Sequence, residues 1–325
     1  MNDKGIDAEL VGTLPTAIAT RITSARRSGS VAGLVVDVAG LDTRARGELE
    51  QALKDLVGSR PGVSEVRVVM TAEKKPRRIL AVGSGKGGVG KSTLAANLAI
   101  ALARSGTKVG LVDADIYGPS QPTIMGVEGI RPEATEKQLI PVPTPSGVPV
   151  LSMGQIVPPG KAIAWRGPMT AGALSQLVDA DWGDTELLVV DMPPGTGDVQ
   201  LTMIQKHKPA GAILVSTPQD LALIDAARAG QLFDQSGVPI VGLIENMAGY
   251  VCPHCGEMSD PFGAGGVEAA AERLELPFLG RVPLALAIRE SGDAGKPPAA
   301  SDDAAVAEPF HAIARKVQEW LAANA

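Results

Sequence analysis

The chain has 325 residues, of which 45% are hydrophobic and 20% charged, and it carries a formal net charge of -6 at pH 7. This length and hydrophobic content suffice for one large α/β core with a small appendage. The acidic balance argues against nucleic acid or an anionic membrane surface as the main partner, because both require concentrated Lys and Arg. The first residues lack the pattern of a signal peptide, and no apolar run approaches the roughly 18 residues that a spanning helix needs. We therefore expect a cytoplasmic protein.

The first part of the chain is predicted to be a small α+β domain. Hydrophobic residues alternate over 30–40 and again over 62–70, as in strands, and they have helical spacing over 46–58. The polar run AEKKPRR carries four basic residues and a proline without an apolar period, which is typical of a solvated linker. We therefore expect a domain at 1–72, a linker at 73–78 and a second domain at 79–325.

The second domain is predicted to be a doubly wound, mostly parallel α/β fold. Short apolar runs alternate with helical segments, and these runs are RILAVGS, KVGLVD, ELLVVD, GAILVST, VPIVGLIEN and PFLGRVP. Strands of this kind are buried on both faces of a parallel sheet, and ligands bind at their carboxyl ends. The Pro- and Gly-rich stretch 140–160 is expected to be a loop around one short strand at 148–152.

The first of these strands runs into a complete phosphate-binding loop. The pattern G-x-x-x-x-G-K-[ST] is met at 85–92, between an expected strand and an expected helix. Glycines let backbone N–H groups surround phosphate oxygens, and the helix N-terminus adds its positive dipole end. Lys91 is expected to neutralise the β/γ-phosphates of ATP, and the Ser92 hydroxyl to bind Mg²⁺. The residues expected to contact nucleotide are Gly85, Gly87, Gly88, Val89, Gly90, Lys91, Ser92 and Thr93.

Three later strands are followed by polar residues that a parallel sheet brings to the same edge. Asp113 and Asp115 are two residues apart and therefore share one face of an extended segment. Asp191 ends another strand and precedes the loop PPGTGD, as expected of a Walker B acid and a switch II loop. Asn246 carries an amide that can both donate and accept hydrogen bonds. Asp113 can equally be a strand cap, and Asn246 a helix cap or turn residue.

The only two cysteines of the chain, Cys252 and Cys255, lie in the turn CPHCG. Their number excludes a disulfide scaffold. A turn of this kind allows both sulfur atoms to point toward one metal centre. Tetrahedral zinc and iron-sulfur clusters usually take four protein ligands, so either His254 and another group join the site or two chains each supply a pair. A thioredoxin-like redox role is disfavoured, because the motif does not open a helix after the first strand of a thioredoxin-like unit.

The phosphate loop contains an additional lysine, Lys86, five residues ahead of Lys91. The pattern K-G-G-x-G-K-S resembles the deviant Walker A motif of the class that includes MinD/ParA proteins and the nitrogenase iron protein. This resemblance implies a homodimer in which Lys86 reaches the nucleotide of the partner subunit. It also implies that Asp115 orients the attacking water, that Asp113 supports the Mg²⁺ shell or the loop, and that Asn246 binds the adenine. The alternative is that Lys86 is a solvated surface lysine.

Over about 79–284 the chain resembles one family more closely, the Mrp family of iron-sulfur cluster carriers. The matching segments are SGKGGVGKS, VDADIYGPS, WRGPM, VDMPPGTGD, TPQDLALID and ENMAGYVCPHCG. The resemblance implies a slow ATPase in which Cys252 and Cys255 of two protomers hold a [4Fe-4S] cluster at the homodimer interface. The cluster would come from the cluster assembly machinery and go to apo-proteins. Residues 1–72 are similar to a MIP18-type domain but lack any cysteine, which leaves docking or packing as their role.

Two rival hypotheses stay open on the sequence. The same four thiolates could hold a structural zinc. The chain could also be a MinD/ParA-like positioning ATPase, which would use a basic amphipathic C-terminal helix to bind a membrane. Here the apolar stripe of the last helix carries few cations and is expected to pack on its own domain, so we expect neither a membrane nor a nucleic acid as partner. The stripe consists of Phe310, Ile313, Val317, Trp320 and Leu321.

Overall fold

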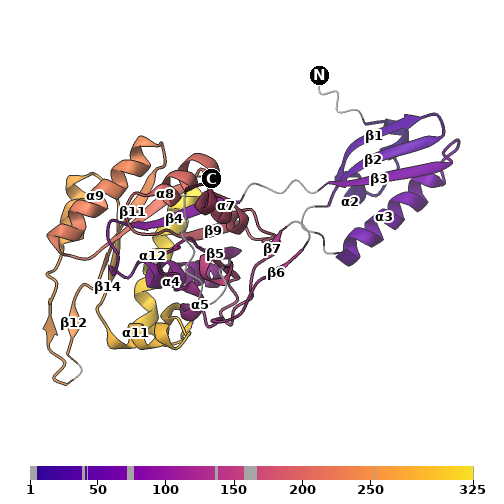
Figure 1. Ribbon diagram of the computed structural model, residues 1–325. Helices are drawn as coiled ribbons and strands as arrows, with labels where there is room; N and C mark the ends of the chain where they lie inside the picture. The colour runs from indigo at the N-terminus through magenta and orange to yellow at the C-terminus, as the bar shows by residue number, and fades with distance from the viewer. Residues whose placement is uncertain are drawn as a thin grey trace. The chain divides into compact units, whose positions relative to one another are not determined.

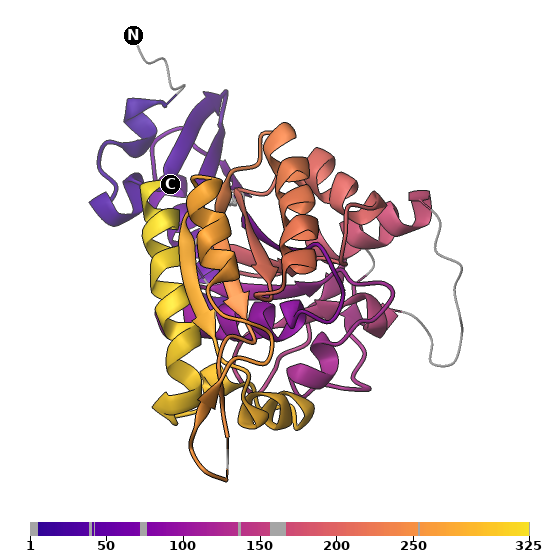
Figure 2. The ribbon, with the colours of Figure 1, turned by 90° about the vertical axis from the view of Figure 1, so that its left-hand side faces the viewer.

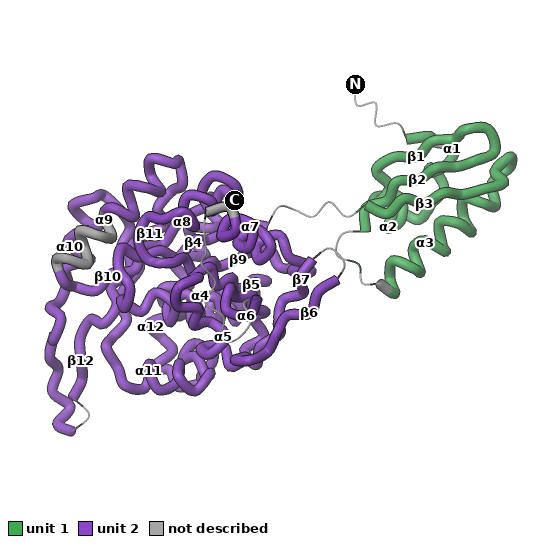
Figure 3. Tube along the Cα trace, viewed as in Figure 1, with its two compact units in different colours: residues 1–76 green, residues 77–325 purple. Residues whose placement is uncertain are grey.

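The computed structural model describes residues 6–38, 41, 43–71, 77–135, 138–156, 167–252 and 254–324. The greater part of the expected linker, 73–76, and the first two residues of the WRGPM segment, 165–166, lie outside these ranges. The chain divides into two compact units, Met1–Pro76 and Arg77–Ala325 (Figure 3).

The first unit is a three-stranded sheet with one long helix packed against it. β1 runs antiparallel to β2, and β2 runs parallel to β3. Alternate residues of β2 enter the core, which explains the period that predicted this strand. β1 was not predicted, because its sequence ITSARRS places polar residues on both faces. The elements are α1 (Ala8–Val11), α2 (Thr16–Ala19), β1 (Ile22–Ser28), β2 (Val31–Asp37), α3 (Thr43–Gly58) and β3 (Glu65–Thr71).

The second unit contains a seven-stranded sheet in which all neighbouring strands are parallel. The strand order is β14-β11-β10-β4-β9-β5-β8. After β4 the chain forms β5 and β8 on one side and returns to place β9 between β4 and β5, and it then moves outward on the other side through β10, β11 and β14. The predicted doubly wound parallel sheet is confirmed. The strands are β4 (Arg78–Ser84), β5 (Val109–Asp113), β8 (Val150–Ser152), β9 (Leu187–Asp191), β10 (Gly211–Ser216), β11 (Ile240–Asn246) and β14 (Phe278–Val282).

Helices cover both faces of this sheet (Figures 1 and 2). In β4, Leu80 and Val82 join one hydrophobic cluster, whereas Ile79 and Ala81 join the cluster on the opposite face. The first face is covered by α4 (Lys91–Arg104) and α12 (Ala304–Ala323). The second is covered by α7 (Gly167–Val178), α8 (Asp198–Thr202), the π-helix η1 (Met203–His207), α9 (Asp220–Gln235) and α10 (Gly266–Arg273).

The apolar stripe of α12 packs on its own unit, as predicted. Phe310, Ile313, Val317 and Leu321 are buried in the first cluster, and Trp320 packs against it while partly exposed. Among the described residues, no helix is both long and apolar enough to cross a membrane.

Short elements join the sheet to its helices. The described part of the stretch 140–160 contains β8, as expected, and also the end of a small hairpin and a complete short helix, neither of which was predicted. These shorter elements are α5 (Gln121–Ile124), β6 (Glu133–Ala134), β7 (Leu139–Ile140), α6 (Met153–Ile156), β12 (Tyr250–Val251), β13 (Met258–Ser259), α11 (Leu286–Asp293) and the 3₁₀-helix η2 (Pro298–Ala300). The carboxyl ends of β4, β5, β9 and β11 share one edge of the sheet, where all the predicted nucleotide residues lie.

Candidate nucleotide and metal site

The phosphate loop occupies residues 85–90, between the end of β4 and the start of α4. Gly88 and Gly90 both have φ of 80°, a left-handed conformation that glycine adopts without strain. A Cβ on Gly90 would also lie 2.1 Å from Nδ2 of Asn246. The first helical hydrogen bond of α4 runs from Leu94 N to Gly90 O at 3.0 Å. The N–H groups before it have no partner inside the helix, which makes this terminus suited to phosphate.

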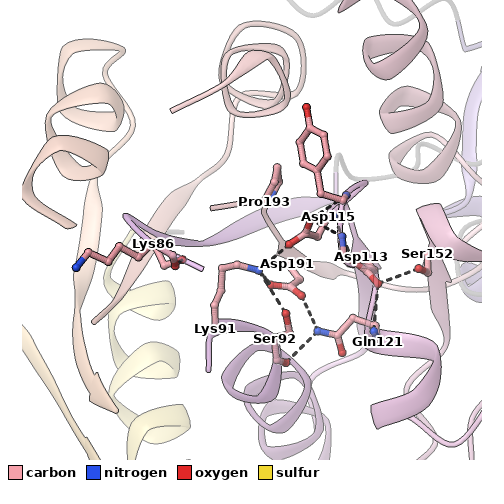
Figure 4. A network of polar contacts seen from close by, with 12 residues as sticks. Lys86, Lys91, Ser92, Asp113, Asp115, Gln121, Ser152, Asp191 and Pro193 are labelled. Carbon is pink, nitrogen blue, oxygen red and sulfur yellow. Dashed lines mark hydrogen bonds and ion pairs between the residues drawn. The ribbon is translucent and has the colours of Figure 1, made fainter. Parts of the chain in front are cut away.

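The ammonium of Lys91 lies at the centre of the predicted site. Its Nζ is 2.5 Å from Oδ1 of Asp191, 3.4 Å from Oγ of Ser92 and 4.0 Å from Oδ2 of Asp115 (Figure 4). The side chain of Lys91 is 6% exposed and that of Asp191 is fully buried. Each charge therefore compensates the desolvation of the other. The fold thus brings together four residues that the sequence assigned to one site.

Asp113 anchors the loop that follows β5. It pairs in register with Ser152 on one side and with Asp191 on the other. Its carboxylate accepts hydrogen bonds from Ser152 Oγ at 2.8 Å and from the main-chain N atoms of Asp115 and Gln121 at 3.1 Å each. Burial, together with the charge of Asp191, raises the pKa of Asp113 to about 7. These contacts favour the loop-supporting role among the alternatives for this residue.

The two carboxylate oxygens of Asp115 have different partners. Oδ1 accepts hydrogen bonds from the main-chain N atoms of Tyr117 and Gly118, at 3.1 and 3.2 Å, and so shapes the turn. Oδ2 lies 4.0 Å from Nζ of Lys91, on the phosphate side of the loop. One oxygen is therefore held by the backbone and the other faces the site.

Gln121 belongs to this network although the sequence did not single it out. Its Nε2 donates to the main-chain O of Ser92 at 2.9 Å and to Oδ2 of Asp191 at 2.8 Å. The side chain has 0% exposure. Only its position could have indicated this role, because Gln121 precedes Pro122 and begins α5, the first helical turn after the Asp113 loop. Polarity alone does not reveal a contact across 70 residues of chain.

The loop after Asp191 is fixed at its start and exposed further along. The N atom of Gly195 donates to Ser84 O at 2.9 Å, and Nε2 of Gln200 donates to Pro193 O at 2.6 Å. Gly195 has φ of 88°. Residues 196–198 are exposed to solvent. This is the arrangement expected of a loop that can change conformation at its distal part while its base stays attached to β4.

The side chain of Lys86 points away from Lys91 and from the carboxylates around it (Figure 4). Its main-chain O accepts a hydrogen bond from Ser84 Oγ at 2.9 Å, which fixes the start of the loop. Lys86 therefore does not duplicate Lys91 within its own chain.

Asn246 contacts the phosphate loop directly. Its Nδ2 donates to Val89 O at 2.7 Å, and the residue is 8% exposed. The amide hydrogen bond thus joins the end of β11 to the loop, a contact that the expected adenine role did not include. After Asn246, Met247 and Gly249 both have positive φ, 58° and 77°, and turn the chain out of the sheet.

The two cysteines lie in the hairpin of β12 and β13, which projects from the body of the second unit (Figures 1 and 2). Cys252 N donates to Glu257 O at 2.9 Å, and Gly256 N donates to Cys252 O at 2.8 Å, with φ of 73° at Gly256. Cys252 is half-buried and Cys255 exposed. Backbone N–H groups of Cys255 and His254 lower the pKa of the Cys252 thiol. The turn therefore stabilises a thiolate at an accessible position, which suits a metal ligand.

Comparison with known proteins finds relatives among P-loop NTPases and iron-sulfur cluster carriers. The model of the ParA family described as NUBPL iron-transfer P-loop NTPase matches residues 75–318. An iron-sulfur cluster carrier protein of Pseudomonas fragi is 46% identical over 266 residues, which cover 78% of this chain and 92% of that protein. An iron-sulfur cluster carrier protein of Deinococcus radiodurans is 41% identical over 305 residues, or 90% of this chain and 87% of the relative.

Two solved structures have the same fold over most of the second unit. A nucleotide-binding protein from Archaeoglobus fulgidus, in complex with ADP and with cobalt detected, superposes with a TM-score of 0.60 at 37% identity. The match covers 67% of this chain and 86% of that one. MinD from Pyrococcus horikoshii, in complex with Mg-ADP, superposes with a TM-score of 0.55 at 24% identity, over 77% of this chain and 99% of that one.

Proposed function

The chain belongs to the ParA family of NUBPL iron-transfer P-loop NTPases, and from this premise we propose that it is an ATP-hydrolysing carrier of [4Fe-4S] clusters. The observation that carries the proposal is that one chain combines a phosphate loop with an exposed cysteine hairpin. The hydrogen bond from Asn246 Nδ2 to Val89 O joins the phosphate loop to the end of β11, and the hairpin begins four residues further along the chain. The relatives named iron-sulfur cluster carrier protein support the same conclusion.

The nucleotide binds to the loop 85–90 and to the first turn of α4. Lys91 leaves Asp191 for the β/γ-phosphates, and Asp115 uses Oδ2, the oxygen that faces the site, to orient the attacking water. The hydroxyl of Ser92 and the carboxylate of Asp191 are the hard oxygen donors that Mg²⁺ prefers, so the residues present fit this ion. Mg²⁺ would supply charge neutralisation on the phosphates.

In the homodimer, each copy contributes to the nucleotide site of the other copy and to a shared cluster site. Lys86, which points away from its own Lys91, reaches the nucleotide of the second copy. Each copy brings the pair Cys252 and Cys255, so that two copies supply the four thiolates that a [4Fe-4S] cluster takes. The cluster is cargo, received from the assembly machinery and delivered to apo-proteins. We place this traffic in the cytoplasm, where thiols stay reduced.

The first unit contains none of the residues that we assign to nucleotide or cluster binding. We propose that residues 1–72 form a MIP18-like domain and that 73–78 connect it to the ATPase domain at 79–325. Because both cysteines lie in the second unit, the first unit serves recipient docking rather than cluster binding.

Cluster transfer to an apo-protein tests this function. The anaerobically reconstituted protein is mixed with an apo [4Fe-4S] dehydratase and an iron chelator, and recovery of dehydratase activity is followed with and without ATP. We expect recovery that exceeds the recovery from the same amount of free iron and sulfide and that responds to ATP. Recovery no faster than from free iron and sulfide would contradict the carrier function.

A further inference from the structure

Gln121 joins two segments of the nucleotide site through one side-chain amide. Both hydrogens of Nε2 are used, one on Ser92 O at 2.9 Å and one on Asp191 Oδ2 at 2.8 Å. The main-chain N of Gln121 donates to Asp113 Oδ2 at 3.1 Å, which fixes the backbone as well. A flipped amide would place Oε1 against two acceptors, so the contacts define the orientation.

The two oxygens of Asp191 have donors of different kinds. Oδ1 accepts from the charged Nζ of Lys91, and Oδ2 accepts from the neutral amide of Gln121. Phosphate competes for an ammonium group far more strongly than for a buried neutral amide. When Lys91 turns to the nucleotide, Gln121 is the donor that continues to hold the carboxylate.

The same amide also sets the separation between Ser92 and Asp191, the two residues that the proposed function assigns to Mg²⁺. This ion requires near-ideal octahedral geometry, so a small displacement of either oxygen weakens its binding. We propose that Gln121 is a positioning residue for the Mg²⁺ site, which it serves by fixing Asp191 relative to the first turn of α4. This inference rests on the proposed nucleotide function.

The test compares nucleotide affinity with and without the ion. A fluorescent ADP analogue is titrated into the full-length protein in EDTA and then at increasing Mg²⁺. For Gln121→Met we expect an ADP affinity in EDTA within about twofold of the wild type. The Mg²⁺ midpoint, which is the Mg²⁺ concentration at half of the change in ADP affinity, should rise about tenfold, because one hydrogen bond to a charged group is lost. A midpoint equal to that of the wild type would overturn the inference. So would an equal loss of affinity in EDTA and in Mg²⁺, since that indicates a purely structural role.

Gln155→Met is the matched control. Gln155 is a buried glutamine at 7% exposure whose Oε1 accepts from Ser152 N at 2.9 Å, with no bond to Asp191. Its Mg²⁺ midpoint should stay at the wild-type value. Gln121→Asn keeps the amide but shortens its reach by one methylene, so it should raise the midpoint in the same direction and serves if Gln121→Met does not fold.

The failures of the two proposals are distinguishable. Wild-type protein that binds ADP without any dependence on Mg²⁺ contradicts the proposed function itself. A Mg²⁺-dependent wild type with unaltered Gln121→Met and Gln121→Asn variants contradicts only the role of Gln121.

Discussion

Lys91 and Asp191, 100 residues apart in the chain, form a buried ion pair with Nζ and Oδ1 2.5 Å apart. α4 supplies the lysine at its first residue, and β9 supplies the aspartate at its last. The pair therefore connects the phosphate loop to the strand beside it. The same contact neutralises two buried charges and holds the lysine that, in the proposed function, binds the phosphates of the nucleotide.

Removing Lys91 should destabilise the second unit. Lys91→Met leaves the buried carboxylate of Asp191 without its counter-charge, and we expect the free energy of unfolding to fall by about 3–5 kcal/mol. Urea unfolding without nucleotide measures this. Lys108→Met is the control, because its pair with Asp184 has side chains that are 54% and 81% exposed and should matter little. An equal loss in the free energy of unfolding in the two variants would show that the buried pair contributes no more than the exposed one.

Replacing Lys86 should separate nucleotide binding from hydrolysis. Lys86 points away from its own Lys91 and, in the proposed dimer, reaches the nucleotide of the second copy. Lys86→Ala should therefore abolish ATP hydrolysis, while ADP binding and reconstituted cluster binding persist. Phosphate release, ADP titration and iron content measure the three properties. The exposed Lys296 is the control, and Lys296→Ala should hydrolyse ATP normally. A parallel loss of ADP binding and hydrolysis would place Lys86 in its own chain's site.

The cysteine hairpin should be dispensable for nucleotide binding. Cys252→Ala and Cys255→Ala should each remove the reconstituted cluster, since each variant loses one thiolate per copy and therefore two of the four ligands of the shared site. ADP affinity should stay at the wild-type value in both. His254→Ala is the control and should retain its cluster, because we assign His254 to the turn. Loss of the cluster in that variant would make His254 a ligand.

Asn246 should transmit nucleotide state to the hairpin. Its amide donates to Val89 O, and β12 begins four residues later, so Asn246→Ala removes the hydrogen bond that joins the phosphate loop to the strand leading into the hairpin. We expect the rate at which a chelator extracts iron to differ between ADP- and ATP-bound wild type and to be equal in the variant. Asn97→Ala is the matched control, because the amide of the buried Asn97 bonds Thr93 O and Ala299 N away from the hairpin. A nucleotide effect that survives in Asn246→Ala would rule this route out.

Asp113 should make stability depend on pH. Its pKa is raised from 3.8 to about 7, so between these values the native state keeps a proton that the unfolded chain has released. The free energy of unfolding should therefore fall as pH rises through this window and level off above it. Urea unfolding of wild type and Asp113→Asn without nucleotide or metal, from pH 5 to 8, isolates this contribution. A difference between the two that is constant with pH would contradict the raised pKa.

The sequence predicted those parts of the site that local pattern determines. The phosphate loop needs glycines at fixed positions, and buried parallel strands need continuous apolar runs, so residues 85–92, Asp113 and Asp191 could be placed at one edge. The packing of α12 followed from its helical stripe in the same way.

Other contacts depend on tertiary structure and left no local signal. The bond from Gln121 to Asp191 and the bond from Asn246 to Val89 join segments 70 and 157 residues apart. Side-chain amides accept many partners, so residue type did not select these. β1 was missed for a different reason, since its pairing with β2 is enforced by the sheet rather than by alternation in its own sequence.

The central claim is that two copies share one cluster. Sedimentation of the anaerobically reconstituted protein, followed both by protein absorbance and by the visible band of the cluster, tests it most directly when combined with iron, sulfide and zinc analysis. We predict that the coloured species sediments as a dimer with about four irons and four sulfides per two chains. A coloured single subunit, or a colourless dimer that holds one zinc, would contradict the account.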